Sequence, residues 1–140
     1  MDKDEVLQQW LHRGKEELIS AEYLSTMRHP TPDETICYLC QQSAEKYLKA
    51  FIFYNDIEPE KTHDLDELLK VCQKFNAEFS TISSNSFILK RYAVLPRYPN
   101  ELGITKEDMK NAISNARAIQ EFIMGIFNKS TNENSEAKND

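Results

Sequence analysis

The stretch ICYLCQQSAEKYLKAF, residues 36–51, is typical of a helix at the centre of a helical bundle. At 100° per residue, most of its apolar and small side chains fall within one sector, and its polar side chains gather on the opposite side. Leu39, Ala50, Ile52 and Phe53 interrupt that polar side. A helix that is apolar on more than one side usually packs against several neighbours or against a partner chain. We therefore expect a central helix here, ending near Tyr54.

Two capping patterns predict where long helices begin. Before the central helix, Thr31 can act as the cap, Pro32 fits the first helical position, and Glu34 completes a capping box with Thr31. Thr105 and Asp108 repeat the same three-residue spacing near the end of the chain. We expect both pairs to satisfy the free backbone N–H groups of the helices that follow them.

The remaining apolar pattern predicts four further helices. A long first helix covers about residues 4–27, and a long last helix extends from the second capping box to about residue 127. Asp64 is the expected cap of a short third helix, and a fourth covers about residues 87–93. The serines within residues 79–85 predict a loop. Together these elements predict an all-α fold, a five-helix bundle with roughly up-and-down connections.

The composition predicts one domain in a reducing compartment. The 140 residues suffice for a continuous core, which we expect over residues 1–128, followed by a disordered polar tail over residues 129–140. No apolar run approaches a membrane span, and the N-terminus lacks the pattern of a secretory signal. Three cysteines form no disulfide framework. We therefore expect a cytoplasmic protein without membrane association.

The net charge of -6 excludes a general polyanion binder but permits a local basic patch. The segment RYAVLPRYP has the best local basic character, because Lys90, Arg91 and Arg97 alternate with Tyr92 and Tyr98. Arginine forks match phosphate oxygens, and tyrosine rings can stack on a base. The same residues also occur in loops for packing or solubility, so the segment alone does not define a site.

Cys37 and Cys40 form a C-x-x-C motif that has three interpretations. Redox chemistry expects this motif at a strand-to-helix turn, and zinc expects a second ligand pair, for which His63 is the nearest candidate. Both cysteines instead lie inside a predicted helix on or near its apolar face, and Cys72 also lies on an apolar stripe. We favour core packing for all three thiols, and we expect no metal and no cofactor.

The polar side of the central helix carries the more informative residues. Glu45 and Lys49 are an i,i+4 pair that would suit a solvated face, but apolar residues are mixed among these charges. His63 precedes the third helix and is either a local turn group or a site residue beside Glu45 and Lys49.

Several of these segments, in this order, resemble the HEPN domain family. The matching segments are WLHRGKEELISAEYL, CYLCQQSAEKYLKAFI, KTHDLDELL, PRYP and AISNARAIQEFI, which span residues 10–123. The resemblance implies a compact helical bundle, commonly a homodimer, with a polar cleft near the dimer contact. It also implies a minimal nucleotidyltransferase as a possible partner, in pairs that include toxin–antitoxin systems.

Many HEPN proteins are metal-independent ribonucleases whose motif is an arginine, four to six residues, and a histidine. This sequence lacks that motif, since no arginine has a histidine at the required distance. We therefore expect no catalytic residues. The resemblance instead implies a ligand-binding set formed by Glu45, Lys46, Lys49, His63, Asp64, Arg97 and Tyr98, whose structural alternative is to hold the third helix and the RYP loop against the second helix.

Three functions follow from this resemblance. The first is a stand-alone, non-catalytic HEPN module that binds a nucleotide or RNA and acts with a minimal nucleotidyltransferase. The second is a divergent ribonuclease that brings His63 and Arg97 together by folding. The third is a purely structural dimerisation or interaction module.

Overall fold

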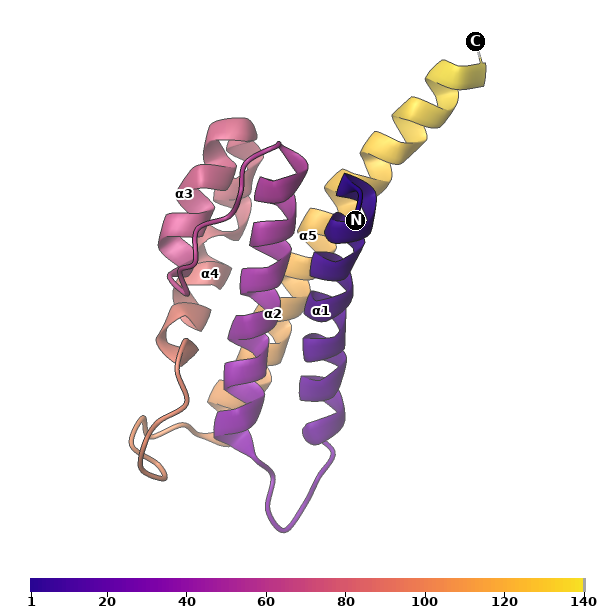
Figure 1. Cartoon of the computed structure of the whole chain (residues 1–140). Helices are drawn as coiled ribbons and strands as arrows, with labels where there is room; N and C mark the ends of the chain where they lie inside the picture. Colours follow the sequence, from indigo (N-terminus) through magenta and orange to yellow (C-terminus); the bar gives the residue numbers. More distant parts are fainter. Residues whose placement is uncertain (140) are drawn as a thin grey trace.

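Helix α2 (Asp33–Tyr54) forms the centre of the molecule, as the sequence predicts. The structure is a computed structural model that describes the backbone of residues 1–139 and the side chains of residues 1–131. Helices α1 (Lys3–Leu24), α3 (Leu65–Phe75) and α5 (Lys106–Asn139) all pack against α2 (Figure 1). Most of α2 between Ile36 and Ile52 is buried, including its polar side.

Helices α1 and α2 run antiparallel. Lys3, at the start of α1, forms a salt bridge with Asp56, just beyond α2 (2.7 Å). Further along, the hydroxyl of Ser43 donates a hydrogen bond to the backbone oxygen of Gly14 (2.7 Å). The two helices approach closely here because glycine has no side chain to separate them.

Helix α3 runs parallel to α2, because residues 55–64 return along the bundle before α3 begins (Figure 1). The side chain of Gln41 donates to the backbone oxygen of His63 (3.0 Å), and the thiol of Cys72 lies 3.6 Å from the backbone oxygen of Leu48. Positions therefore advance in the same direction along both helices. The alternating directions expected of an up-and-down bundle resume between α3 and α4 (Ser83–Leu89), whose far end reaches Asp66 through Lys90.

The segment predicted as a loop at residues 79–85 is helical, which corrects the prediction. A 3-10 helix, η1 (Ala77–Ile82), leads directly into α4, and a second, η2 (Lys90–Tyr92), follows α4. Phe79 and Ile82 are buried in the core. The serines fit because their hydroxyls can bond to nearby backbone, as Ser83 does to the carbonyl oxygen of Ser80 (3.0 Å). Burial of the apolar pair thus outweighs the local preference for a loop.

Of the caps, the one predicted for α2 is wrong. Its N-cap is Pro32, without a side-chain hydrogen bond, whereas Thr31 donates to the backbone oxygen of Met27 and Glu34 accepts the backbone N–H of Asn100. The capping box does not form because the side chains of Thr31 and Glu34 bond to backbone groups outside the first turn of α2. The other two predictions are confirmed. Asp64 caps α3, and the capping box before α5 forms in both directions, at 3.0 and 3.1 Å.

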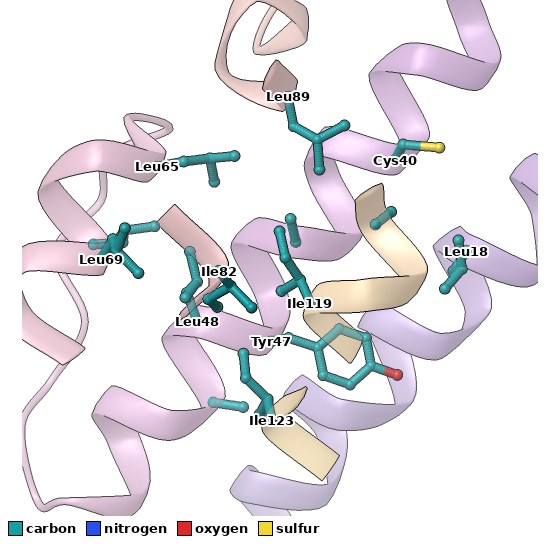
Figure 2. Close-up of a cluster of buried hydrophobic side chains, with 14 of the residues drawn as sticks. Leu18, Cys40, Tyr47, Leu48, Leu65, Leu69, Ile82, Leu89, Ile119 and Ile123 are labelled. Atoms are coloured by element: carbon teal, nitrogen blue, oxygen red, sulfur yellow. The ribbon is translucent and has the colours of Figure 1, made fainter. Parts of the chain in front are cut away.

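A single apolar core joins all five α-helices, and Figure 2 shows part of it around Tyr47 and Ile119. The three thiols are buried in this core, which confirms their predicted packing role. Burial raises the pKa of Cys37 and of Cys72 to about 12. His63, the ligand considered for zinc, contacts Glu45 instead. In the part of the chain that the structure describes, no three histidine, cysteine or acidic side chains are placed to hold a metal.

Helix α5 is longer than the sequence predicts. It continues past Phe127 to Asn139, and its last turns extend beyond the rest of the bundle (Figure 1). The structure thus has helical backbone in most of the segment predicted to be a disordered tail, and Asp140 lies outside the described residues. The division into a domain over residues 1–128 and a tail stays a prediction. No helix in the described chain combines the length and apolarity needed to cross a membrane.

Candidate functional site

The side chain of Glu45 is a buried carboxylate at the middle of α2, with 2% of its surface exposed. One oxygen, Oε1, accepts a hydrogen bond from Nδ1 of His63 (2.7 Å). The other, Oε2, lies 3.2 Å from Nζ of Lys49 and 3.8 Å from Nζ of Lys46. A single carboxylate therefore organises three ionisable side chains from two parts of the chain.

His63 is placed by the return segment between α2 and α3. Its backbone oxygen accepts from Gln41, and the next residue, Asp64, caps α3 through the backbone N–H groups of Asp66 and Glu67. The imidazole itself is 63% exposed. Because Nδ1 donates to Glu45, the remaining ring nitrogen, Nε2, is left for a hydrogen-bond partner from outside the cluster. This geometry combines the two interpretations of the sequence, in which His63 is a turn group or lies beside Glu45.

Lys46 extends the cluster to α1. Its ammonium group lies 3.4 Å from Oε1 of Glu17 and donates to Oε1 of Gln42 (3.1 Å). The amide of Gln42 in turn donates to Oε1 of Gln41 (2.8 Å). Burial raises the pKa of the Glu17 carboxyl, and the nearby charge of Lys46 opposes that rise. A continuous polar network thus connects α1, α2 and the start of α3 inside the bundle.

The charges in this cluster nearly cancel. The carboxylates of Glu17 and Glu45 balance the ammonium groups of Lys46 and Lys49. Glu45 and Lys49 are buried, which indicates a supporting role, whereas the exposed imidazole of His63 and the partly exposed Lys46 can contact a ligand.

A hollow of about 310 Å³ opens beside Lys46 on the surface between α1 and α2. Trp10 and Arg13 line it from α1. The ammonium of Lys49 lies 6.0 Å from the centroid of the Trp10 ring, at the outer limit of a cation–π contact. The hollow therefore adjoins the Glu45 cluster through two lysines.

The structure does not bring Arg97 and Tyr98 to this cluster. Both are in the loop before α5, where the Arg97 guanidinium lies 5.8 Å from the Tyr98 ring centroid. The loop is attached to the start of α2, because the backbone N–H of Asn100 donates to Glu34 (2.6 Å). Glu34 precedes Glu45 by eleven residues, which corresponds to about 16 Å along a helix. Of the predicted set, Glu45, Lys46, Lys49, His63 and Asp64 are adjacent, and the two loop residues are apart.

Another hollow, of about 650 Å³, lies between α4 and α5. Three of its polar side chains are already bonded within the protein. Arg91 donates to the backbone oxygen of Leu102, Lys90 pairs with Asp66, and the amide of Asn115 bonds on both sides. The hollow beside Trp10 is smaller, and it contains Arg13, whose guanidinium has no hydrogen bond or salt bridge among residues 1–131.

Sequence reasoning missed the contribution of α1. Trp10, Arg13 and Glu17 recur at three- and four-residue spacing, so they lie on one face of the helix. The nearby Gly14, which permits close approach of α2, was the available signal that this face meets α2.

Comparisons with known proteins agree with this architecture. A family model described as HEPN domain matches residues 7–127. The chain is similar to the crystal structure of TT1696 from Thermus thermophilus, with a TM-score of 0.71, 20% sequence identity, and 85% of this chain and 96% of that chain covered. It is also similar to ST0689, an archaeal HEPN homologue, with a TM-score of 0.65, 20% identity, and coverage of 85% and 95%. At this identity the two structures show the fold alone. A sequence comparison with curated proteins gives no match.

Proposed function

The chain belongs to the HEPN domain family, and from this premise we propose that it is a non-catalytic module that binds a nucleotide or RNA segment. The binding surface lies over the Glu45 cluster, where the exposed imidazole of His63 and the partly exposed ammonium group of Lys46 face the ligand and the buried Lys49 supports them. This proposal leaves Arg97 and Tyr98 out of the ligand-binding set predicted from the sequence, because both residues lie on a separate loop.

The observation that carries this proposal is the buried carboxylate of Glu45. It holds the exposed imidazole of His63 by Nδ1 while two lysines occupy its other oxygen. Burying a carboxylate is unfavourable unless its charge is compensated. The cluster therefore holds the imidazole of His63 and the ammonium group of Lys46 at fixed positions near the surface, and both groups can donate hydrogen bonds to an anionic ligand.

The ribonuclease alternative requires an arginine and a histidine on the same phosphate, one to stabilise developing charge and one to move a proton. The fold holds Arg97 near the start of α2 and His63 near its middle. Cleavage of RNA that disappears in His63→Ala would restore this alternative. Retention of intact RNA by the wild-type protein is the result that we expect.

Calorimetric titration with ATP, GTP and a short single-stranded RNA, at low and moderate salt, tests the binding proposal. We expect saturable binding that weakens in His63→Ala and is unchanged in Arg97→Ala, which removes a positive charge elsewhere. Loss in Arg97→Ala alone would move the site to the loop. No heat with any of the three ligands would leave the interaction-module alternative.

The proposal includes partners, as expected for this family. We propose self-association and a complex with a minimal nucleotidyltransferase. Support comes from two exposed apolar side chains on α1, Ile19 and Tyr23, and from the exposed Met27, three residues beyond the end of α1. Ile19 and Tyr23 are four residues apart and therefore lie on one face of the helix, and neighbouring exposed apolar side chains of this size favour a partner surface. Co-purification with the nucleotidyltransferase, or its failure, tests the second part.

A further inference from the structure

The hollow between α1 and α2 is formed by one face of a helix and one lysine. Val6, Gln9, Trp10 and Arg13 are spaced by three, one and three residues, so their side chains gather on one face of α1, opposite Lys46 of α2. Because both helices are rigid elements of the bundle, the positions of these groups are fixed before any ligand arrives.

Two cations in this hollow differ in their partners. Lys46 is already shared between Glu17 and Gln42. Arg13 is exposed and makes no hydrogen bond or salt bridge with any residue among 1–131. Its charge is nevertheless close enough to Glu17 to oppose the rise in the pKa of that carboxyl, which burial causes. The planar guanidinium of Arg13 therefore has N–H donors available that can bond to two phosphate oxygens at once.

The local charge suits one kind of phosphate. Arg13, Lys46 and Lys49 contribute three positive charges, and Glu17 and Glu45 contribute two negative charges. The excess of one positive charge matches the single charge of a phosphodiester. A triphosphate carries several negative charges and would leave most of them uncompensated beside a buried carboxylate.

The hollow also presents an aromatic surface. Trp10 is half-buried and packs against the core, so its indole is held in place while part of it remains accessible. Nucleobases stack on such rings with little dependence on base identity. The volume of about 310 Å³ lies at the low end of ligand-binding hollows, which span roughly 300–1,000 Å³. It therefore suits one nucleotide unit.

From these features we propose that the hollow binds one nucleotide unit of single-stranded RNA, with the phosphodiester on Arg13 and Lys46 and the base on Trp10. This inference rests on the proposed function and specifies its ligand class and its contacts.

The chain contains one tryptophan, so Trp10 reports on its own site. We expect a short single-stranded RNA to quench its fluorescence saturably, ATP to do so more weakly, and inorganic phosphate to have no effect. In calorimetry with the same RNA, Arg13→Ala weakens binding about tenfold or more. Lys15→Ala removes the same charge from α1 but lies outside the hollow, and it leaves affinity within about twofold at matched salt.

A second pair of variants separates stacking from folding. Trp10→Phe retains an aromatic ring and binds RNA close to wild type, whereas Trp10→Leu weakens binding at least about fivefold. Circular dichroism melting confirms that each variant is folded before titration. Equal affinities for Trp10→Phe and Trp10→Leu would overturn the stacking contact.

The outcomes distinguish this inference from the proposed function. RNA binding with unchanged tryptophan fluorescence, and with Arg13→Ala equal to wild type, overturns the inference and leaves the function standing. Absence of all nucleotide and RNA binding overturns both. Tighter binding of ATP than of RNA overturns the phosphodiester assignment, since it identifies a free nucleotide as the ligand.

Discussion

At the scale of single residues, Glu45 determines how the polar side of α2 is arranged. The sequence places it on a face that would normally be solvated, and the structure buries it between α1 and α3. Its partners then become buried as well, and only His63 keeps most of its side chain in solvent. The side chain of Glu45 thus connects the polar residues of this face of α2 in a hydrogen-bonded and ion-paired network inside the bundle.

Glu45→Gln keeps the side-chain shape but removes the charge that faces Lys49 and Lys46. We expect a loss of about 3 kcal/mol in the free energy of unfolding, because breaking a buried ion pair from one side leaves the other charge uncompensated. Urea unfolding measures this loss. Glu16→Gln is the matched control, since the side chain of Glu16 is 59% exposed and pairs with His12. This substitution changes stability by less than about 0.5 kcal/mol. Equal losses in both variants would contradict the role of Glu45.

The residues of the Glu45 cluster could be predicted from sequence, and the loop residues could not be placed. Glu45 and Lys49 are neighbours by helix geometry, and their contact follows from spacing alone. His63 is eighteen positions away from Glu45, and only the returning segment brings it there. Arg97 has the same chemistry as a site residue, but its position depends on a loop attachment through Asn100 that no local pattern indicates.

At the scale of elements, the contact between α1 and α2 depends on Gly14. A Cβ atom there would lie 2.9 Å from a ring carbon of Tyr47. We expect Gly14→Ala to destabilise the protein by about 1–3 kcal/mol, because overpacking outweighs the better helix propensity of alanine. Gly125→Ala is the control, since a Cβ there meets nothing within 4 Å, and it should gain about 0.5–1 kcal/mol. Thermal unfolding of both variants checks the opposite signs.

The start of α5 has a testable pH dependence. Hydrogen bonds from the backbone and hydroxyl of Thr105 lower the pKa of Asp108 below its usual value of 3.8. A lowered pKa in the folded state stabilises the protein above the unfolded-state pKa, and this contribution is lost as pH falls through the folded-state pKa. We therefore expect wild type to exceed Asp108→Asn in stability at about pH 6, and the difference to shrink toward about pH 3. Urea unfolding at several pH values measures it; a constant difference would contradict the cap.

Helices with a strong apolar period were predictable, whereas the segment between α3 and α4 was not. Helices α2 and α5 each carry an apolar stripe that spans many turns. The 3-10 helix η1 and helix α4 contain serines that favour a loop locally, and burial of Phe79 and Ile82 decides otherwise. The same holds for Thr31 and Glu34, whose spacing fits a capping box but whose partners lie outside the helix start.

At the scale of the whole molecule, an all-α bundle around one core follows from the apolar spacing of the five predicted helices. The parallel course of α3 beside α2 does not, because a connection as long as residues 55–64 permits either direction. Tertiary contacts such as Gln41 with His63 fix it.

The core predicts the reactivity of the thiols. Cys37, Cys40 and Cys72 are buried, and burial raises the pKa of all three. Because the thiolate is the reactive form, we expect no labelling of the native protein by a disulfide reagent within minutes at about pH 8. Three thiols per chain should react after unfolding in urea. A rapidly labelled native thiol would show that the core opens more readily than its packing implies.

Self-association is the remaining prediction for the whole molecule. Tyr23, which is 75% exposed, is the more exposed of the two apolar side chains, Ile19 and Tyr23, on this face of α1. We expect sedimentation to show a dimer of wild type at tens of micromolar and a monomer of Tyr23→Glu, because a charge in a buried interface is strongly unfavourable. Phe87→Glu is the control on α4 and should remain dimeric. A monomeric wild type would remove the self-association proposal.

The course of the chain through α3 and α4 divides the bundle into two parts. Helices α1, α2 and α5 pack directly on one another. The elements that separate α2 from α5 in the sequence, α3, η1 and α4, lie to one side of these three helices (Figure 1). Amide hydrogens at the centre of α2 are therefore shielded from both sides and exchange with solvent only when the whole bundle opens. Those of α3 and α4 can exchange through a smaller opening that leaves the three-helix frame intact. Protection against exchange then changes most sharply across the contact between α2 and α3.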